Sequence, residues 1–199
     1  MGWLEGELIR SGAVLFGEFR LTSGGVSHVY VDMRKVIGDP RLFRLISLEL
    51  SHRLLDIGCG DCVAVGVATG GVPWASAIAL ELGLPLAYAR HPKGHGTERD
   101  LEGAEVSSRG AVVIDDVATT GGSLAFAAKV AKSHGAREVI AEVIVDRGQG
   151  AREALEQMGV RLLSLTTLRD ILSEALRLKV IDEARLRSIE EELWGQARP

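Results

Sequence analysis

The sequence predicts a single-domain α/β fold in which a mostly parallel, twisted sheet is flanked by helices and preceded by an N-terminal hairpin. Three observations point to this class. Short runs rich in Val and Ile alternate with segments of helical periodicity between residues 36 and 166. The length of 199 residues suits one α/β domain. Hydrophobic residues make up 46% of the chain, which is enough for a sizeable core.

The N-terminal part is expected to hold a helix, a hairpin and a second helix. Helices are indicated by apolar residues three or four positions apart, and the hairpin by a Gly-containing turn between two apolar runs. In order, these elements are a short helix within Trp3 to Phe16, hairpin strands Phe19 to Leu21 and Val29 to Met33 around Ser23-Gly24-Gly25, and a helix from Asp39-Pro40 to Gly58. The second helix starts at Asp39-Pro40 because proline fits the first turn of a helix.

Strands and helices then alternate, which implies parallel strands joined by right-handed crossovers. The expected order is strand Val63 to Ala68, helix Val72 to Leu82, strand Leu86 to Arg90, strand Ala111 to Ile114, helix Leu124 to Ser133, strand Val139 to Val145, helix Ala151 to Met158 and strand Leu162 to Leu165. The polar segment His91 to Val106 is expected to bury little. From Thr167 onward, one or two amphipathic helices are expected to serve packing. The chain therefore divides into residues 1–35, a core over 36–166, and C-terminal helices over 167–199.

Charge and hydropathy exclude several classes of function. The net charge of −4 gives no general reason to bind nucleic acid or an anionic membrane. Glu5 and Glu7 interrupt the place of a signal peptide, and the most apolar stretch, Val72 to Ala89, is broken by two prolines and a glutamate. We expect a cytoplasmic protein without a membrane segment. The only cysteines, Cys59 and Cys62, have either an incidental or structural role or form a reversible local disulfide.

Residues 112–123 join an apolar, β-branched run to two adjacent acids and a small-residue loop that opens a helix. Asp115 and Asp116 would lie at the carboxyl edge of the sheet, where they can accept hydrogen bonds from sugar hydroxyls. A phosphate could be bound by the loop's donors, which are the amides of Gly121 and Gly122 and the hydroxyls of Thr119, Thr120 and Ser123. The pattern favours a site for a phosphorylated ribose. The alternatives are a magnesium site or a plain turn with a helix N-cap.

Three further segments could contribute to such a site. The glycine turn in Gly66 to Pro73 follows a strand and precedes a helix, so it is either a second anion-binding nest or a plain turn. The cationic segment Arg90 to Asp100 is either a mobile lid over a pyrophosphate or a solvated surface loop. Arg147, at the carboxyl end of another strand, either pairs with a planar anionic base or is a surface arginine.

These segments together resemble a known family. Residues 112–123 closely resemble the signature that binds 5-phosphoribosyl pyrophosphate (PRPP) in type I phosphoribosyltransferases. Phe19 to Asp32 resembles the substrate-covering hairpin of orotate phosphoribosyltransferases, and Val145 to Ala151 is similar to their base-recognising segment. The resemblance spans nearly the whole chain. It implies a type I phosphoribosyltransferase fold with the hairpin as a hood.

The resemblance also implies an activity and a set of site residues. The reaction is transfer of ribose 5-phosphate from PRPP to orotate, giving orotidine 5′-monophosphate and pyrophosphate, with Mg²⁺ held mainly by the substrate. The expected assembly is a homodimer in which the cationic loop reaches partly into the other subunit's site. The expected residues are Asp115, Asp116, Arg90, Lys93 and His95 for catalysis; Ala118, Thr119, Thr120, Gly121, Gly122 and Ser123 for the 5′-phosphate; Thr69, Gly70, Gly71, Arg90, His91, Lys93 and His95 for the pyrophosphate; and Thr119, Arg147, Tyr30, Thr22 and Ser23 for orotate.

The chain departs from the family pattern at three places. Thr22 stands where the family usually has a lysine in the hairpin, Thr69-Gly70 replaces an aromatic–lysine pair, and His91 replaces another lysine. Each lost contact to a desolvated anion corresponds to roughly 1.5–3 kcal/mol. Two alternatives to the enzyme therefore remain. One is a PRPP- or nucleotide-sensing protein with little or no catalysis, and the other is a phosphoribosyltransferase for another base.

Overall fold

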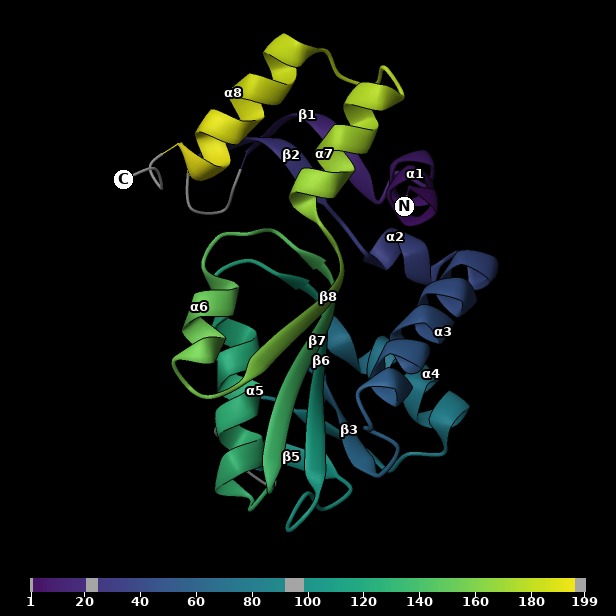
Figure 1. The fold of residues 1–199 in the computed structure, drawn as a ribbon, viewed down its shortest axis with the longest axis vertical. Coiled ribbons are helices and arrows are strands. Elements are labelled where there is room, and N and C mark those ends of the chain that lie inside the picture. The colour runs from purple at the N-terminus through teal and green to yellow at the C-terminus, as the bar shows by residue number, and fades with distance from the viewer. Residues whose placement is uncertain (1, 21–24, 92–98, 196–199) are drawn as a thin grey trace.

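A six-stranded sheet forms the centre of the protein, as seen in a computed structural model that describes residues 2–20, 25–91 and 99–195 (Figure 1). The strand order is β5-β4-β3-β6-β7-β8. The strands are β3 (Cys62–Val67), β4 (Leu86–Ala89), β5 (Leu101–Gly103), β6 (Gly110–Ala118), β7 (Glu138–Asp146) and β8 (Arg161–Thr167). All neighbours are parallel except β4 and β5, which are antiparallel. The predicted mostly parallel sheet is confirmed.

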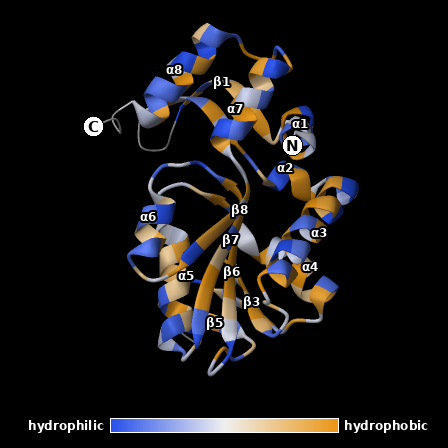
Figure 2. Cartoon of the chain, viewed as in Figure 1, coloured by the Kyte–Doolittle hydropathy of each residue, from blue (hydrophilic) through white to orange (hydrophobic). Residues whose placement is uncertain are grey.

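Helices cover both faces of this sheet, with α3 (Pro40–Asp56) and α4 (Gly71–Leu82) on one side and α5 (Gly122–Ser133) and α6 (Ala151–Glu156) on the other (Figure 1). Each face buries its own apolar cluster, and the strands between them are hydrophobic along most of their length (Figure 2). Such continuous apolar strands are typical of a sheet covered on both faces. Helix α3 starts as predicted, because the Asp39 carboxylate accepts hydrogen bonds from the amides of Arg41 and Leu42.

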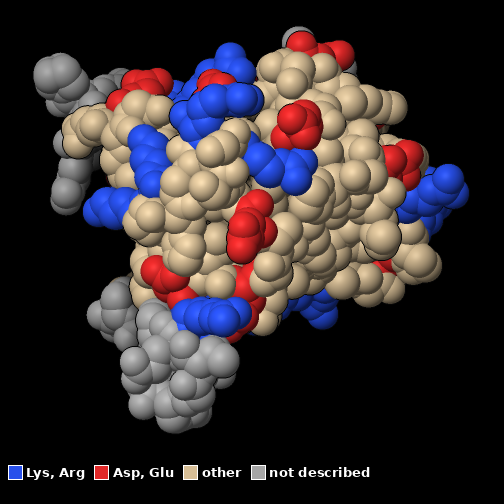
Figure 3. All heavy atoms as spheres, turned by 90° about the horizontal axis from the view of Figure 1, so that it is seen from below, with Lys and Arg blue, Asp and Glu red and all other residues tan. Residues whose placement is uncertain are grey.

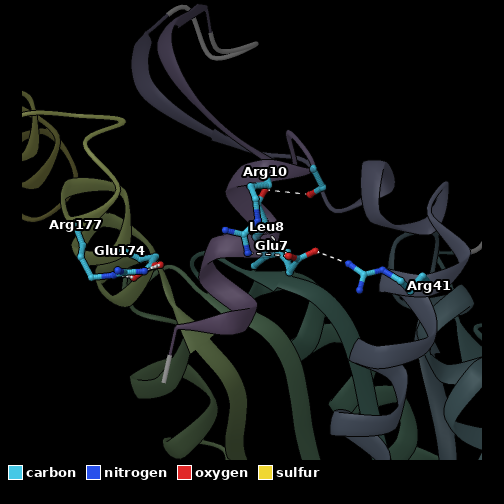
Figure 4. A network of polar contacts seen from close by, with 7 residues as sticks. Glu7, Leu8, Arg10, Arg41, Glu174 and Arg177 are labelled. Carbon is cyan, nitrogen blue, oxygen red and sulfur yellow. Dashed lines mark hydrogen bonds and ion pairs between the residues drawn. The ribbon is translucent and has the colours of Figure 1, made fainter.

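The N-terminal and C-terminal segments share a layer above the carboxyl edge of the sheet (Figure 1). This layer holds α1 (Trp3–Arg10), β1 (Val14–Arg20), β2 (Val26–Val31), α2 (Arg34–Ile37), α7 (Leu168–Arg177) and α8 (Glu183–Trp194). Helix α1 packs against α7, and α8 contacts β2. An ion pair of 2.8 Å between Glu7 and Arg41 ties α1 to α3, while Glu174 and Arg177 pair separately on α7 (Figure 4).

Several sequence expectations need correction. Val14 to Phe16 were expected in a helix but lie in β1, because Val14 and Phe16 pair across the hairpin with Val31 and Val29. The short helix α2 and the edge strand β5 were not expected. The segment His91 to Val106 was expected to bury little, yet Leu101 and Val106 are 8% and 1% exposed. Strand β5 pairs with β4, and this pairing carries Leu101 into the core.

Three other expectations concern the surface and the cysteines. Basic and acidic side chains are intermixed on the face drawn in Figure 3, as the small net charge suggests. Within the described residues, every helix is too short or too polar to cross a membrane. Cys59 and Cys62 form a disulfide with a Cα–Cα distance of 5.3 Å, so of the two roles considered for them the local disulfide is the one formed.

Candidate active site

The predicted site residues gather where the order of the strands in the sheet reverses. From β3 the chain builds β4 and β5 on one side, and β6 to β8 continue on the other, so β3 and β6 are neighbours at the switch point. Ligands of open α/β sheets bind outside the carboxyl ends of strands at such a point. The turn Thr69 to Gly71 follows β3, and the loop Thr119 to Gly121 follows β6. The topology therefore places both predicted anion-binding segments side by side.

Asp115 and Asp116 lie near the carboxyl end of β6 as an interacting acid pair. Asp115 is only 8% exposed, and its Oδ1 accepts a hydrogen bond of 3.0 Å from the Asp116 amide. Burial, followed by the negative charge of Asp116, raises the pKa of Asp115 to about 8. Burial also raises the pKa of Asp116, although a hydrogen bond from the Val117 amide and the charge of Arg34 oppose the shift. The pair therefore favours a ligand that donates hydrogen bonds or carries positive charge.

The loop after β6 surrounds a hollow of about 160 Å³, which is lined by Asp115 and by residues 117–124. Helix α5 begins at the floor of this hollow, and no side chain in the described structure caps its N-terminus. Gly121 is the N-cap residue of this helix, so the first amides are left without a side-chain acceptor in the described structure. Gly121 has φ of +82°, and a Cβ there would lie 3.0 Å from the Ala151 Cα, so only glycine fits this backbone. The loop directs amides of the first helical turn toward an anion.

The turn after β3 lies directly against the acid pair. A Cβ on Gly70 would lie 3.0 Å from Oδ1 of Asp116, and a Cβ on Gly71 would lie 1.9 Å from the carbonyl oxygen of Ile114. Helix α4 starts at Gly71, and its N-terminus also has no side-chain cap among the described residues. The peptide between Ala68 and Thr69 is cis. A second set of helix N-terminal amides thus opens beside the first.

Arg147 belongs to the segment after β7 and is held next to the loop that follows β6. Its amide donates a 2.9 Å hydrogen bond to the carbonyl oxygen of Ala118. The side chain is partly buried, so the alternative of a surface arginine is wrong. Burial lowers the pKa of the guanidinium, and the charge of Glu192 acts against that shift. Within the described structure, Nε of Arg147 and Oε1 of Gln149 are buried without a hydrogen-bond partner. Buried polar atoms without a partner are uncommon in proteins, which favours a ligand contact in this segment.

The remaining predicted residues lie at the margins of this region. Arg90 pairs with Glu102 at 3.0 Å, and His91 stacks on Phe126 of α5 with ring centroids 3.9 Å apart. The backbone of Arg90 bonds to that of Asp100, which brings the two ends of the cationic segment together. Tyr30 is 37% exposed and accepts a hydrogen bond of 3.2 Å from Arg34. Four predicted residues lie outside the described residues, namely Thr22, Ser23, Lys93 and His95.

Sequence analysis missed four residues that act on the site or lie in the same sheet. Arg34, at the start of α2, lowers the pKa of Asp116, and Glu192 of α8 acts on Arg147. Gln149 was within the base segment but had no assigned role. Glu142 on β7 is 0% exposed, and burial raises its pKa to about 8. Its only sequence signal is an acid inside an apolar strand, which by itself suggests an exposed position.

The acid pair fits a weakly held magnesium ion and not a complete protein-built metal centre. In the described part of the chain, no three His, Cys, Asp or Glu side chains come together as ligands. Asp115 and Asp116 supply the hard oxygen donors that Mg²⁺ prefers, and this ion commonly takes only one or two carboxylates together with substrate phosphates. The donor set therefore suits an ion that arrives with its phosphorylated ligand.

Comparisons with known proteins agree with this geometry. The family model of the phosphoribosyl transferase domain matches residues 40–160. The orotate phosphoribosyltransferase of Aeropyrum pernix is 48% identical over 172 residues, which cover 84% of this chain and 90% of that protein.

Two solved structures lead to the same family. A crystal structure of orotate phosphoribosyltransferase from Aeropyrum pernix aligns with a TM-score of 0.73 at 43% identity, covering 86% of this chain and 98% of that one. The Mycobacterium tuberculosis orotate phosphoribosyltransferase in complex with PRPP aligns with a TM-score of 0.69 at 29% identity, covering 84% and 96%. From its sheet, its paired anion-binding turns and these relatives, the chain belongs to the orotate phosphoribosyltransferase family of phosphoribosyltransferases.

Proposed function

We propose that this protein transfers ribose 5-phosphate from PRPP to orotate and releases pyrophosphate. The observation that carries the proposal is the meeting of three features at one edge of the sheet. These are the buried acid pair of β6, the hollow above the N-terminus of α5, and the turn that places Gly70 against Asp116. PRPP presents a ribose between a 5′-phosphate and a diphosphate, so its three parts match the three features in order.

Each part of PRPP has its own group of residues in this proposal. The ribose hydroxyls donate to Asp115 and Asp116, which also act in catalysis. The 5′-phosphate lies in the hollow, bound by the loop Ala118, Thr119, Thr120, Gly121, Gly122 and Ser123. The pyrophosphate is bound by Thr69, Gly70, Gly71, Arg90, His91, Lys93 and His95. Arg90, Lys93 and His95 also counter the charge on the leaving group. Support comes from the uncapped helix starts after both turns.

The chemistry follows from this placement. The bond between C1′ and the diphosphate oxygen breaks, a bond forms between C1′ and a nitrogen of orotate, and that nitrogen loses its proton. Positive charge grows on the ribose ring as pyrophosphate leaves, so the neighbouring carboxylates stabilise the transition state. Holding both substrates in line removes the entropic cost of their encounter. When Mg²⁺ is bound, it neutralises charge on the diphosphate.

The residues around Arg147 favour a base that carries an acidic group. Arg147 brings a partly buried guanidinium with an unpartnered Nε to the segment beside the ribose loop, and such a group suits a planar carboxylate-bearing ring. Thr119, Tyr30, Thr22 and Ser23 complete the proposed orotate site. Gln149 joins them, because its buried Oε1 lacks a partner in the described structure. A purine without an acidic group would leave the buried Nε of Arg147 without a partner among the described residues.

The proposal extends to assembly and location. Residues 1–199 act as one phosphoribosyltransferase domain. Two copies form a homodimer in which the cationic segment Arg90 to Asp100 of one copy reaches the site of the other. Large apolar side chains on α3 and α4 remain exposed, with Leu80 at 86% and Leu55 at 50%, and burial of these side chains would favour a dimer. The protein works in the cytoplasm on PRPP and orotate, with Mg²⁺, and does not act on nucleic acid or membranes.

The direct test is an assay with PRPP, Mg²⁺ and a panel of free bases. We expect the absorbance of orotate to fall and orotidine 5′-monophosphate to accumulate, with little reaction of adenine, hypoxanthine or uracil. Binding of PRPP by calorimetry without transfer to any base would favour a sensing protein. Faster transfer to another base would move the assignment to another phosphoribosyltransferase.

A further inference from the structure

Helix α8 contacts the hairpin at two separate points. The Glu192 carboxylate accepts hydrogen bonds from the backbone amide of His28 at 3.1 Å and from its Nδ1 at 2.6 Å. Near the start of the same helix, Arg185 donates a 2.9 Å hydrogen bond to the carbonyl oxygen of Gly17 on β1. Both strands of the hairpin are therefore tied to a helix that lies more than 150 residues later in the sequence.

The end of α8 contacts the Arg147 segment. The indole Nε1 of Trp194 donates a 3.1 Å hydrogen bond to the carbonyl oxygen of Arg147. The guanidinium of Arg169, at the start of α7, lies 3.9 Å from the centroid of the Trp194 ring. Trp194 is only 8% exposed, so its ring is held in one place by packing as well as by these polar contacts.

Glu192 and Trp194 therefore act on the same arginine in different ways. The indole holds the backbone of Arg147, and the carboxylate of Glu192 stabilises the positive charge of its side chain against the cost of burial. The Nε of Arg147 still has no hydrogen-bond partner among the described residues. The helix thus fixes the backbone that carries the guanidinium and supplies a compensating negative charge.

We propose that α8 is a strap that joins the hairpin to the Arg147 segment, and that Trp194 and Glu192 are positioning residues for the base. The proposal rests on the function proposed above, in which Arg147 and the hairpin contact orotate. It adds a role for a part of the chain that lies outside residues 40–160, the region matched by the family model. The two residues act through Arg147 and His28, so they are expected to govern the binding of the base and to leave PRPP binding unchanged.

The first test is Trp194→Phe, which keeps an aromatic ring against Arg169 and removes the hydrogen bond to Arg147. The matched control is Trp3→Phe, at an α1 position whose side chain is 43% exposed. A net hydrogen bond of about 1 kcal/mol corresponds to a change of about fivefold, so we expect the KM for orotate to rise about fivefold. The Kd for PRPP, measured by calorimetry, should stay within twofold, and Trp3→Phe should match the unmodified protein.

The second test is Glu192→Gln, with Glu191→Gln as its neighbour on the same helix. Glutamine can still accept a hydrogen bond from the His28 amide, but it cannot balance the charge of Arg147. We expect the KM for orotate to rise threefold or more for Glu192→Gln and to stay unchanged for Glu191→Gln. This variant keeps the proposal testable if Trp194→Phe does not fold.

The outcomes separate the strap from the function on which it rests. Turnover by the unmodified protein, with equal orotate KM values for the variants and their controls, would overturn the strap alone. Equal losses of orotate and PRPP binding would also overturn it, because they indicate general loosening of the fold. Absence of turnover by the unmodified protein would overturn both proposals. A selective rise in the orotate KM supports both.

Discussion

The two sides of the candidate active site are built in different ways. The phosphate side combines the acid pair with two backbone turns, at Gly71 against the backbone of β6 and at Gly121 against the backbone of Ala151 in α6. The base side consists of side chains, including Arg147, Glu192 and Trp194, that reach one another from distant parts of the chain. A backbone site is sensitive to added volume, and a side-chain site is sensitive to lost polar groups. The predictions below test this difference, starting with the largest expected effect.

Gly71→Ala should damage the phosphate side most severely. The added Cβ would lie 1.9 Å from the Ile114 carbonyl oxygen, so the turn and β6 must move apart. We expect a loss of about 1–3 kcal/mol in the free energy of unfolding. We also expect a fall of about 100-fold or more in kcat/KM, because displacement by about 1 Å disturbs the alignment of the substrates.

The control for Gly71→Ala is Gly60→Ala, where an added Cβ has nothing within 4 Å. Urea unfolding and the orotate assay should give values close to those of the unmodified protein for this control. Normal activity of Gly71→Ala would show that the turn does not need its close contact with β6.

Asp116→Asn should reduce transfer without affecting the fold. Loss of a charged hydrogen-bond acceptor next to the ribose removes about 1.5–3 kcal/mol of transition-state stabilisation, or roughly 10- to 150-fold in kcat/KM. Asp56→Asn, at the exposed end of α3, provides the same chemical change away from the site. An active Asp116→Asn enzyme with an unchanged melting temperature would contradict the role of the acid pair.

The affinity for PRPP should rise with pH on the phosphate side. The pKa of Asp115 is raised to about 8, so below that pH the free protein holds a proton that ribose hydroxyl donors must displace. Binding should therefore strengthen about fivefold from pH 7 to pH 8 and about twofold more before it levels off near pH 9. The measurement is calorimetry at constant free Mg²⁺. The Asp115→Asn variant should lose this rise of PRPP affinity with pH. Identical pH profiles for the variant and the unmodified protein would refute the assignment to Asp115.

Reduction of the Cys59–Cys62 disulfide should have the smallest effect and spare both sides of the site. The bond closes a loop of only four residues, from Cys59 to the first residue of β3, Cys62, at the amino end of that strand. Chain entropy then gives about 2 kcal/mol of stability, which urea unfolding with and without reductant can measure. The free energy of unfolding of the double variant Cys59→Ser, Cys62→Ser should be the same with and without reductant. A fall in kcat on reduction would mean that the disulfide acts on the site.

Sequence analysis predicted the strand, the loop and the helix start of the phosphate side because they depend on local order. A strand, two acids and a glycine loop are adjacent in the chain, and their spacing reports the geometry directly. The same reasoning predicted the parallel sheet but placed Val14 to Phe16 in a helix, because short apolar runs fit both periods. The pairing of β1 with β2 decided the outcome.

The base side could be predicted only in part. Arg147 was predicted as a site residue because it follows a strand, whereas Glu192 and Trp194 act across more than 40 residues of sequence and leave no local signal. Their helix showed only an amphipathic pattern, which indicates packing in general. Glu142 was missed for a related reason, since an acid inside a strand gives no sign that it will be fully buried.

The contact of α8 with the N-terminal hairpin above the sheet has a consequence for biosynthesis. Ribosomes make the hairpin long before α8, so the contacts of Trp194 and Glu192 form only after α8 has been synthesised. The close contacts of the turns after β3 and β6 are with elements made earlier than α8, namely β6 for Gly71 and the start of α6 for Gly121. A nascent chain would therefore acquire the phosphate side before it could select a base.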